Sequence, residues 1–364
     1  MHINNPKLYG ALSTSILIAI VALVYFSSST TPTVSSVSQS EQKWAYTNSF
    51  QFERRAFSAV AFNEHMYVIG GVNNQGEYVR PVEYAKIKPD GALGPWQITS
   101  ALYDDRFYLD AVAINGFIYA IGGANGSLGD DNRPSASVSK AKILKEGSLG
   151  PWLKQAYLTT PRRGLRVVNT DTTIYALGGY NGSFLRTVER STLLPNGDIE
   201  SWQADQEESL VDRYIHSAAI HKNQIILLAG HVDKSDSMSY ADVETATIKP
   251  NKTLTPWKIE RSRLNQPRFI ASATAFNNYI YIAGGHNGKN RINNVEFTSV
   301  SSRGTLGQWR NAAPLNTARS AAALVHYNKF IYMLGGSSNQ GVTNTVEYAQ
   351  QDKSGRLLLP SVEH

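Results

Sequence analysis

The hexapeptide MYVIGG at residues 66–71 decides the fold, because close copies of it return five more times along the chain. These copies are IYAIGG at 118–123, IYALGG at 174–179, ILLAG at 226–230, IYIAGG at 280–285 and IYMLGG at 331–336. The first residues of the six doublets are Gly70, Gly122, Gly178, Ala229, Gly284 and Gly335. Successive copies are thus 52, 56, 51, 55 and 51 residues apart, a period that is typical of one supersecondary unit per repeat.

Three further positions keep a fixed distance from their neighbours in the repeat. An arginine stands sixteen residues before every doublet, at Arg54, Arg106, Arg162, Arg213, Arg268 and Arg319. An acidic residue follows the doublet at Glu83, Glu189, Glu244, Glu296 and Glu347, and Ser139 replaces it in the second copy. A tryptophan lies thirteen residues after that position in five copies, at Trp96, Trp152, Trp202, Trp257 and Trp309.

The last copy lacks its tryptophan, because Pro360 stands thirteen residues after Glu347. Trp44 lies 26 residues before Gly70, just as Trp96 lies 26 residues before Gly122. We therefore predict that the strand around Trp44 completes the last copy, near Val346–Tyr348, and joins the two ends of the repeat array.

Each copy has the pattern of four strands. Alternation such as SAVAF at 58–62 predicts the first strand, and a short turn leads to the doublet strand. The third strand is VEYAKI at 82–87, and the fourth begins near the tryptophan. This arrangement resembles the kelch repeat, over roughly residues 44–350. The resemblance implies an all-β fold, a six-bladed kelch-type β-propeller over residues 43–360 with four strands per blade.

The N-terminus has a different character. Residues 1–7 precede an uncharged, largely apolar stretch from Leu8 to Phe26, which is long enough to cross a bilayer as one transmembrane helix. The next cation after Lys7 is Lys43, so the charge bias predicts that everything after the stretch is exported. The stretch is either an uncleaved membrane anchor or a signal peptide that is removed, which would release the protein. Residues 27–42 are rich in Ser and Thr and predict a disordered linker.

The composition excludes several kinds of function. The chain has no cysteine, so it can form no disulfide, no thiolate site and no Cys–Tyr cofactor of the galactose-oxidase kind. The net charge is +6, but Lys and Arg are spread along the chain, and we expect no nucleic-acid partner. The eight histidines lack metal-ligand spacing, and we expect neither a metal nor a cofactor.

The repeated landmarks have structural explanations. Each arginine begins the first strand and each glutamate begins the third, so we expect a structural ion pair across the small residues of the doublet. Arg106 has no such glutamate, and we expect it to turn to Asp104, Asp105 or solvent. The six tryptophans are interpreted as packing residues between blades.

Function is expected on the loops that join strands two and three, because the spacing from doublet to acidic position varies between 11 and 17 residues while the other spacings hold. Tyr108 and Phe269 lie just past the arginines on the same face. The candidate ligand-binding residues are Asn125, Tyr180, Asn181, Tyr214, His216, His231, His286 and Asn287. The asparagines have a simpler explanation as turn formers.

The sequence supports two functions. The first is a non-catalytic recognition module, displayed outside a membrane, that binds a protein or a glycan. The second is a sugar-active enzyme, because exported bacterial six-bladed kelch propellers include sialic acid mutarotases. No catalytic motif carries that likeness beyond the scaffold. A deep pocket in which a carboxylate converges with a His or Arg would favour the enzyme, and a broad face would favour recognition.

Overall fold

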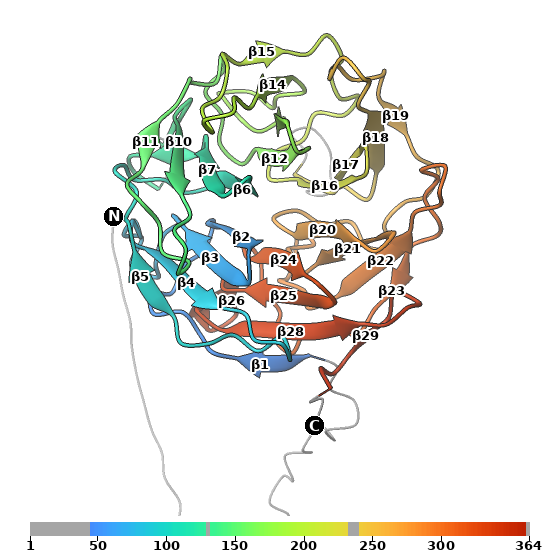
Figure 1. Ribbon diagram of the computed structural model, residues 1–364. Coiled ribbons are helices and arrows are strands. Elements are labelled where there is room, and N and C mark those ends of the chain that lie inside the picture. Colours follow the sequence, from blue (N-terminus) through green and yellow to red (C-terminus); the bar gives the residue numbers. More distant parts are fainter. Residues whose placement is uncertain (1–43, 129–131, 232–239, 362–364) are drawn as a thin grey trace, which may run out of the picture. The chain divides into compact units, whose positions relative to one another are not determined.

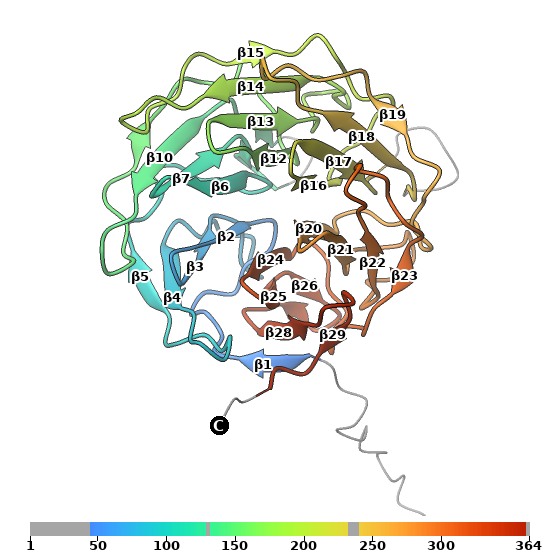
Figure 2. The same ribbon diagram turned by 45° about the vertical axis from the view of Figure 1, so that its right-hand side comes forward.

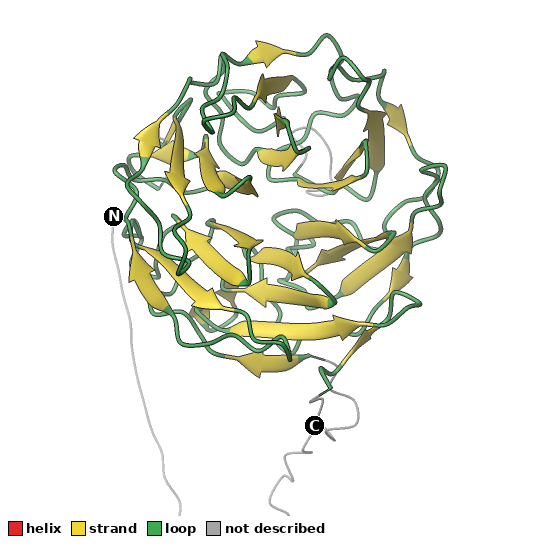
Figure 3. Cartoon of the chain, in the orientation of Figure 1, coloured by secondary structure: helices red, strands yellow, loops and turns green. Residues whose placement is uncertain are grey.

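The computed structural model describes residues 44–128, 132–231 and 240–361, which form a ring of six antiparallel sheets around a central axis (Figures 1 and 2). Strands and loops make up all of this part of the chain (Figure 3). No helix of the described residues is long and apolar enough to span a membrane. The predicted tail at 1–7, transmembrane segment at 8–26 and linker at 27–42 lie outside the described residues.

Each sheet is one blade, and its strands follow one another outward from the axis. The innermost strands are β2 (Ser58–Phe62), β6 (Asp110–Ile114), β12 (Arg166–Asn169), β16 (Ser217–His221), β20 (Ser272–Phe276) and β24 (Ala323–Tyr327). The doublet strands are β3 (His65–Ile69), β7 (Phe117–Ile121), β13 (Thr173–Leu177), β17 (Gln224–Leu228), β21 (Tyr279–Ala283) and β25 (Phe330–Leu334). The third strands are β4 (Val82–Lys86), β10 (Val138–Lys142), β14 (Val188–Thr192), β18 (Val243–Thr247), β22 (Val295–Ser299) and β28 (Val346–Gln351).

The outer strands are short. They are β5 (Gln97–Thr99), β11 (Leu153–Lys154), β15 (Gln203–Ala204), β19 (Lys258–Ile259) and β23 (Arg310–Asn311), with β1 (Ala45–Thr47) and β29 (Leu357–Leu358) in the sixth blade. Two small ribbons, β8 (Ala124–Asn125) with β9 (Arg133–Pro134) and β26 (Ser337–Ser338) with β27 (Gly341–Val342), lie in the loops between strands two and three.

The sixth blade is closed by both ends of the described chain. β1 pairs with β28 in the register Ala45–Tyr348 to Thr47–Val346, which confirms the predicted closure. β29 extends the same edge, with Leu358 opposite Gln350. Trp44 is fully buried, and its indole donates to the Ala313 carbonyl of the fifth blade at 3.0 Å. The outer strand of this blade is therefore shared by two segments, whereas the sequence predicted only the N-terminal one.

The middle strands of each blade are buried on both faces, and adjacent blades pack against each other there through apolar side chains. Tyr67, Ile69, Ile118 and Ala120, for example, belong to one cluster between the first two blades. The tyrosine of the doublet strand also crosses to the next blade: the Tyr67 hydroxyl donates to the Gly147 carbonyl at 2.7 Å. Tyr119, Tyr175, Tyr281 and Tyr332 make the equivalent bond to Gly197, Lys252, Gly355 and Gly91.

The doublet permits this close approach of neighbouring blades. Gly70 has φ +69°, and a Cβ there would lie 2.8 Å from the Leu109 side chain of the next blade and 2.9 Å from the Arg106 carbonyl. Ala229 takes the same left-handed conformation in the fourth blade, with φ 62°. In the next blade the position that corresponds to Leu109 is the small Ala271, which belongs to the same cluster as Ala229, so the extra methyl group is accommodated.

A buried ion pair, here called the clasp, lies under each doublet except the second. In the first blade the Arg54 guanidinium bonds Glu83 at 2.7 Å and donates to the Gly70 carbonyl at 3.0 Å. Glu83 also accepts hydrogen bonds from the backbone N–H groups of Gln51 and Phe52, which lie in the segment that connects the sixth blade to the first. The predicted pairs of the other blades are confirmed in Arg162–Glu189, Arg213–Glu244, Arg268–Glu296 and Arg319–Glu347.

The second blade departs from this arrangement as expected. Arg106 bonds Asp104 at 3.0 Å and the Ser137 hydroxyl at 2.6 Å. The Ser139 hydroxyl, in the place of the glutamate, is buried without a hydrogen-bond partner among the described residues. Burial lowers the pKa of Arg54 to about 10, against the opposing effect of Glu83, so the guanidinium stays charged at neutral pH.

Closure is tested by Trp44→Ala. Loss of this fully buried indole is expected to lower the free energy of unfolding by about 3–5 kcal/mol, because it leaves a cavity between blades five and six. The control is Tyr46→Ala, two residues further along in β1, where the side chain is 52% exposed. Urea unfolding followed by circular dichroism measures both, and equal small losses would contradict the closing role of Trp44.

The clasp is tested in the fifth blade. Arg268→Ala and Glu296→Ala should each lower the free energy of unfolding by about 3–5 kcal/mol, because either change leaves the partner's buried charge without its counter-charge. The double variant should lose less than the sum of the two. Arg263→Ala is the control, since this arginine is 62% exposed and its pair with Asp242 is worth less than about 1 kcal/mol. Unchanged melting of both clasp variants would show that the pair is not structural.

Candidate loop-face binding site

A continuous row of nine rings lies along the face that carries the variable loops; two of the rings are buried and the other seven are half-buried. We call it the aromatic belt. Its members are Tyr78, Phe107, Tyr108, Tyr180, Phe184, Tyr214, His231, Phe269 and His286. Neighbouring centroids are 5.1 to 6.3 Å apart, and the rings are tilted or edge-on rather than parallel. The belt extends from the first blade to the fifth.

The belt follows from the backbone next to the clasp. The residue after the clasp arginine forms an isolated bridge with the residue after the doublet. Phe269 is bridged to His286 in this way, and Tyr214 to His231. Because the clasp fixes both segments from below, side chains at these two positions are held next to each other on the loop face. Whether a blade adds rings to the belt at this point depends on which residues occupy the two positions.

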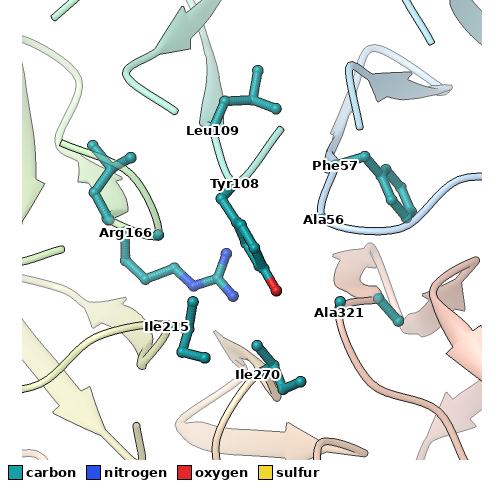
Figure 4. A pocket seen from close by; sticks show the side chains of 11 residues that line it. Ala56, Phe57, Tyr108, Leu109, Arg166, Ile215, Ile270 and Ala321 are labelled. Atoms are coloured by element: carbon teal, nitrogen blue, oxygen red, sulfur yellow. The ribbon is translucent and has the colours of Figure 1, made fainter. Parts of the chain in front are cut away.

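The channel is closed at this face by the residues two positions after the six repeated arginines, which are the five clasp arginines and Arg106. All six have left-handed backbones, at Ala56, Tyr108, Gly164, Ile215, Ile270 and Ala321. Five backbone hydrogen bonds of 2.7 to 3.0 Å link them around the axis, from Gly164 through Tyr108, Ala56, Ala321 and Ile270 to Ile215. Within this ring a cavity of about 20 Å³ remains, into which Tyr108 and Arg166 point (Figure 4). That volume is enough for about one water molecule.

A second cavity of about 130 Å³ lies along the innermost strands, and Asp110 and Arg166 both line it. Asp110 accepts hydrogen bonds from the Ser58 hydroxyl and the Val167 backbone, each at 2.8 Å. Arg166 donates to the His216 carbonyl at 2.8 Å and the Ala271 carbonyl at 3.2 Å. The carboxylate and the guanidinium are thus each bonded to the protein, and they form no ion pair with each other among the described residues. This part of the chain contains no group of three or more possible metal ligands.

The structure brings together four of the predicted binding residues. Tyr180, Tyr214, His231 and His286 all belong to the aromatic belt. Burial raises the pKa of the Tyr214 hydroxyl and lowers the pKa of His286, to which Arg291 also contributes. Both side chains are therefore neutral at pH 7.

The other predicted residues lie apart from the belt. Asn125 is on the ribbon strand β8, and Asn181 is exposed at a loop tip. The Asn287 side chain accepts the backbone N–H groups of Lys289 and Asn290, which is the turn-forming role that the sequence also allowed.

His216 does not reach the loop face, which corrects its place among the candidates. Its side chain is fully buried and lies against the doublet of the third blade, where a Cβ on Gly178 would be 2.9 Å from its ring. Burial and the nearby arginines hold its pKa well below the usual value. The left-handed backbone of Ile215, with φ 46°, turns the chain after Tyr214 and directs His216 into the interface between blades.

Sequence reasoning missed the cations of this face. Arg163 follows the clasp arginine of the third blade, and its guanidinium carbon lies 4.7 Å from the Tyr180 ring centroid and 5.5 Å from that of Tyr214. Arg166 begins β12 and points into the cavity within the ring (Figure 4). The signal that could have found Arg163 is the position directly after each clasp arginine, which supplies a loop-face residue in every blade.

Comparisons with known proteins agree with this architecture. The Kelch motif matches residues 161–190 and 267–296, in the third and fifth blades. Beta-scruin from Limulus polyphemus is 22% identical over 271 residues, which are 72% of this chain and 27% of that protein. Kelch-like protein 36 from Bos taurus is 24% identical over 276 residues, 72% of this chain and 41% of its own length. The chain thus spans between about a quarter and two-fifths of these relatives.

A solved structure, that of YjhT, superposes with a TM-score of 0.67 over 85% of this chain and 98% of its own, at 14% identity. At that identity the similarity concerns the fold alone. The six matched copies of the doublet, the confirmed clasps and the two motif matches lead to the same conclusion. The protein is a kelch-repeat β-propeller with six blades.

Proposed function

We propose that this protein is a non-catalytic recognition module that binds a protein or a glycan through the aromatic belt. The belt is the observation that carries the proposal. Rings provide large contact areas at low entropic cost and recur as binding hot spots. Scaffold positions are nearly constant between blades, whereas the loops that supply the belt differ in length and sequence. Protein binding is also a common role of kelch propellers.

The two cavities along the axis favour recognition over catalysis at this face. The carboxylate and the arginine that share the inner cavity are both hydrogen-bonded to the scaffold, and that cavity is only about 130 Å³. The ring of left-handed residues leaves about 20 Å³ at the loop face. A sugar-active site of the mutarotase kind would need a larger pocket with free acid and base groups. The broad belt favours a macromolecular ligand.

The full chain, screened on peptide and glycan arrays, supplies a ligand for the decisive measurement. Tyr180→Ala and His286→Ala should then weaken binding by tenfold or more, about 1.4 kcal/mol, with a nearly unchanged melting temperature. Tyr46→Ala, an exposed tyrosine on the outer edge of the sixth blade, should leave the affinity unchanged. If the belt variants lose stability and keep their affinity, the rings are scaffold and the binding surface lies elsewhere.

We further propose that the propeller is displayed outside a membrane. The proposal rests on the uncharged Leu8–Phe26 stretch and on the charge bias after Lys7. Protease added to intact cells that lack an outer barrier should therefore remove the propeller. Protection of the unaltered protein would contradict export.

A matched pair of variants separates the effect of the stretch from the effect of added charge. Changing Ile18, Ile20 and Val21 to aspartate places three charges in the apolar stretch, where each is costly to insert, and should leave the protein protected inside. The control changes Ser35, Ser36 and Ser38 to aspartate, which adds the same charge after the stretch and should leave the propeller accessible to protease.

A further inference from the structure

The face opposite the aromatic belt, here called the turn face, is built from two sets of turns. The turns that join strands one and two lie on it, together with the turns that join strands three and four. In five blades the strand 3–4 turn accepts the hydrogen bond from the doublet-strand tyrosine of the preceding blade, always at the same position of the turn. These five turns are therefore held in the same way, and the turn face presents them as a regular surface.

Positive charge is concentrated on the part of the turn face that blades four, five, six and one contribute. The turns of these four blades, with the last residues of their third strands, hold three carboxylates, at Glu64, Asp90 and Asp352. They hold nine cations, which we call the basic patch: Lys86, Lys88, Lys222, Lys249, Lys252, Arg303, Lys329, Lys353 and Arg356. All but Lys252 and Lys329 are exposed, and these seven form no ion pair within the described part of the chain.

Pairs of these cations line hollows between the turns of neighbouring blades. Two adjoining hollows of about 380 Å³ each lie between the sixth and first blades. Lys88 lines both of them, together with Lys329 in one and Lys86 in the other. A third hollow of about 250 Å³ lies between the fourth and fifth blades and is lined by Lys222 and Arg303. Each hollow is larger than the cavities along the axis, and each offers two cations to one anionic group.

Exposed leucines accompany the cations on the turn face. At the turn position of Lys88, the second and third blades have Leu144 and Leu194, which are 39% and 40% exposed. A surface that combines Lys and Arg with exposed leucines is typical of segments that lie on lipid headgroups, where the cations meet anionic lipid and the leucines enter the acyl boundary. A surface for single-stranded nucleic acid would instead present aromatic rings for base stacking, and the large hydrophobic side chains exposed on these described turns are leucines.

The described chain begins in the sixth blade, beside the basic patch. β1 runs from Ala45, opposite Tyr348, to Thr47, opposite Val346, and thus toward the loop face. Its first residue therefore lies at the end of the strand that is nearer to the turn face. The apolar stretch Leu8–Phe26, proposed above as the basis of membrane display, precedes this point in the chain. The direction of β1 thus favours a membrane on the side of the turn face.

We propose that the turn face binds an anionic lipid surface, with lipid phosphates in the hollows of the basic patch and the aromatic belt directed away from the membrane. This inference goes beyond the proposed recognition function and rests in part on the proposed display beside a membrane. Each Lys or Arg close to an anionic lipid surface strengthens binding by about fivefold, so seven exposed cations can supply selective attachment. The belt on the opposite face then remains open to its own ligand.

The lack of cysteine allows a single label to be placed on the full chain. Ser302→Cys carries a dye that brightens in apolar surroundings on an exposed strand 3–4 turn, and Asn290→Cys carries it on the loop face of the same blade. Vesicles of phosphatidylcholine, with or without phosphatidylglycerol, offer the apolar stretch the same hydrocarbon core and differ in surface charge. With phosphatidylglycerol, the dye at 302 should reach half its maximal brightness at about a tenfold lower lipid concentration, whereas the dye at 290 should not distinguish the vesicles.

A matched pair of triple variants tests the basic patch. Changing Lys88, Lys249 and Arg303 together to glutamine should raise the half-maximal concentration of phosphatidylglycerol vesicles by about tenfold or more, because three surface cations are lost. The control changes three exposed cations on the loop-face side of blades four and five to glutamine and should shift that concentration less than about twofold. The control residues are Arg261, Arg263 and Lys289. Melting temperatures show whether the variants are folded. About 1 M NaCl gives a second measurement without substitution, since it should abolish the preference for phosphatidylglycerol.

Equal responses to the two kinds of vesicle, or equal effects of the two triple variants, would overturn the proposal. A dye at 302 that responds to hexaglutamate or to DNA at a lower concentration of anionic groups than to lipid would also overturn it, because the face would then bind a soluble polyanion. Membrane display is judged separately by protease. If intact cells lose the propeller to protease while the dye at 302 ignores phosphatidylglycerol, display stands and the lipid-binding face is wrong. If the dye responds while the cells protect the propeller, the lipid-binding face stands and export is wrong.

Discussion

A guanidinium without access to water needs acceptors inside the protein for most of its N–H groups, and this requirement organises every blade. The clasp arginine meets it with a glutamate of the third strand and a carbonyl of the doublet. The glutamate in turn binds backbone N–H groups of the segment that arrives from the previous blade. One ion pair therefore ties together three stretches of one repeat: the entering segment that carries the arginine, the doublet and the third strand. A buried pair of this kind adds little net stability, but it is costly to break, and so it fixes geometry.

The clasps determine how the backbone is arranged on the loop face. The residue after each arginine is bridged to the residue after the doublet, and the next residue turns left-handed to join the ring around the axis. These constraints act on the backbone and leave side chains free to differ from blade to blade. Aromatic residues occupy at least one of the two bridged positions in the second to fifth blades, whereas the sixth has Ser320 and Ser337. The scaffold thus presents six similar frames, and the belt extends over the first five of them.

Much of the fold could be predicted because it depends on distances along one repeat. The position of Arg54 before the first strand and of Glu83 in the third places them at one end of the blade, and the missing tryptophan identifies the closing strand. The C-terminal part of that outer strand, β29, has only two residues and carries none of the repeated positions, so the sequence does not predict it.

Contacts between blades are harder to predict, because they join positions about 50 residues apart. The sequence predicts His216 on the loop face only because it lies close to Tyr214 in the chain. The left-handed residue between them, Ile215, turns the His216 side chain inward. Arg163 and Arg166 are harder to identify, because most other repeats carry a different residue type at these two positions.

The shared outer strand of the sixth blade has a consequence for chain order. β1 and β29 lie along the same edge of β28, with Ala45 opposite Tyr348 and Leu358 opposite Gln350. The points where the described chain enters and leaves the ring are therefore neighbours on its rim. A ring whose entry and exit adjoin has no intrinsic first blade, and a short bridge across that point would make the backbone circular. Such a circular backbone could be opened at any exposed turn and would still contain the same six blades. The order in which the blades are synthesised is therefore a property of the gene rather than of the fold.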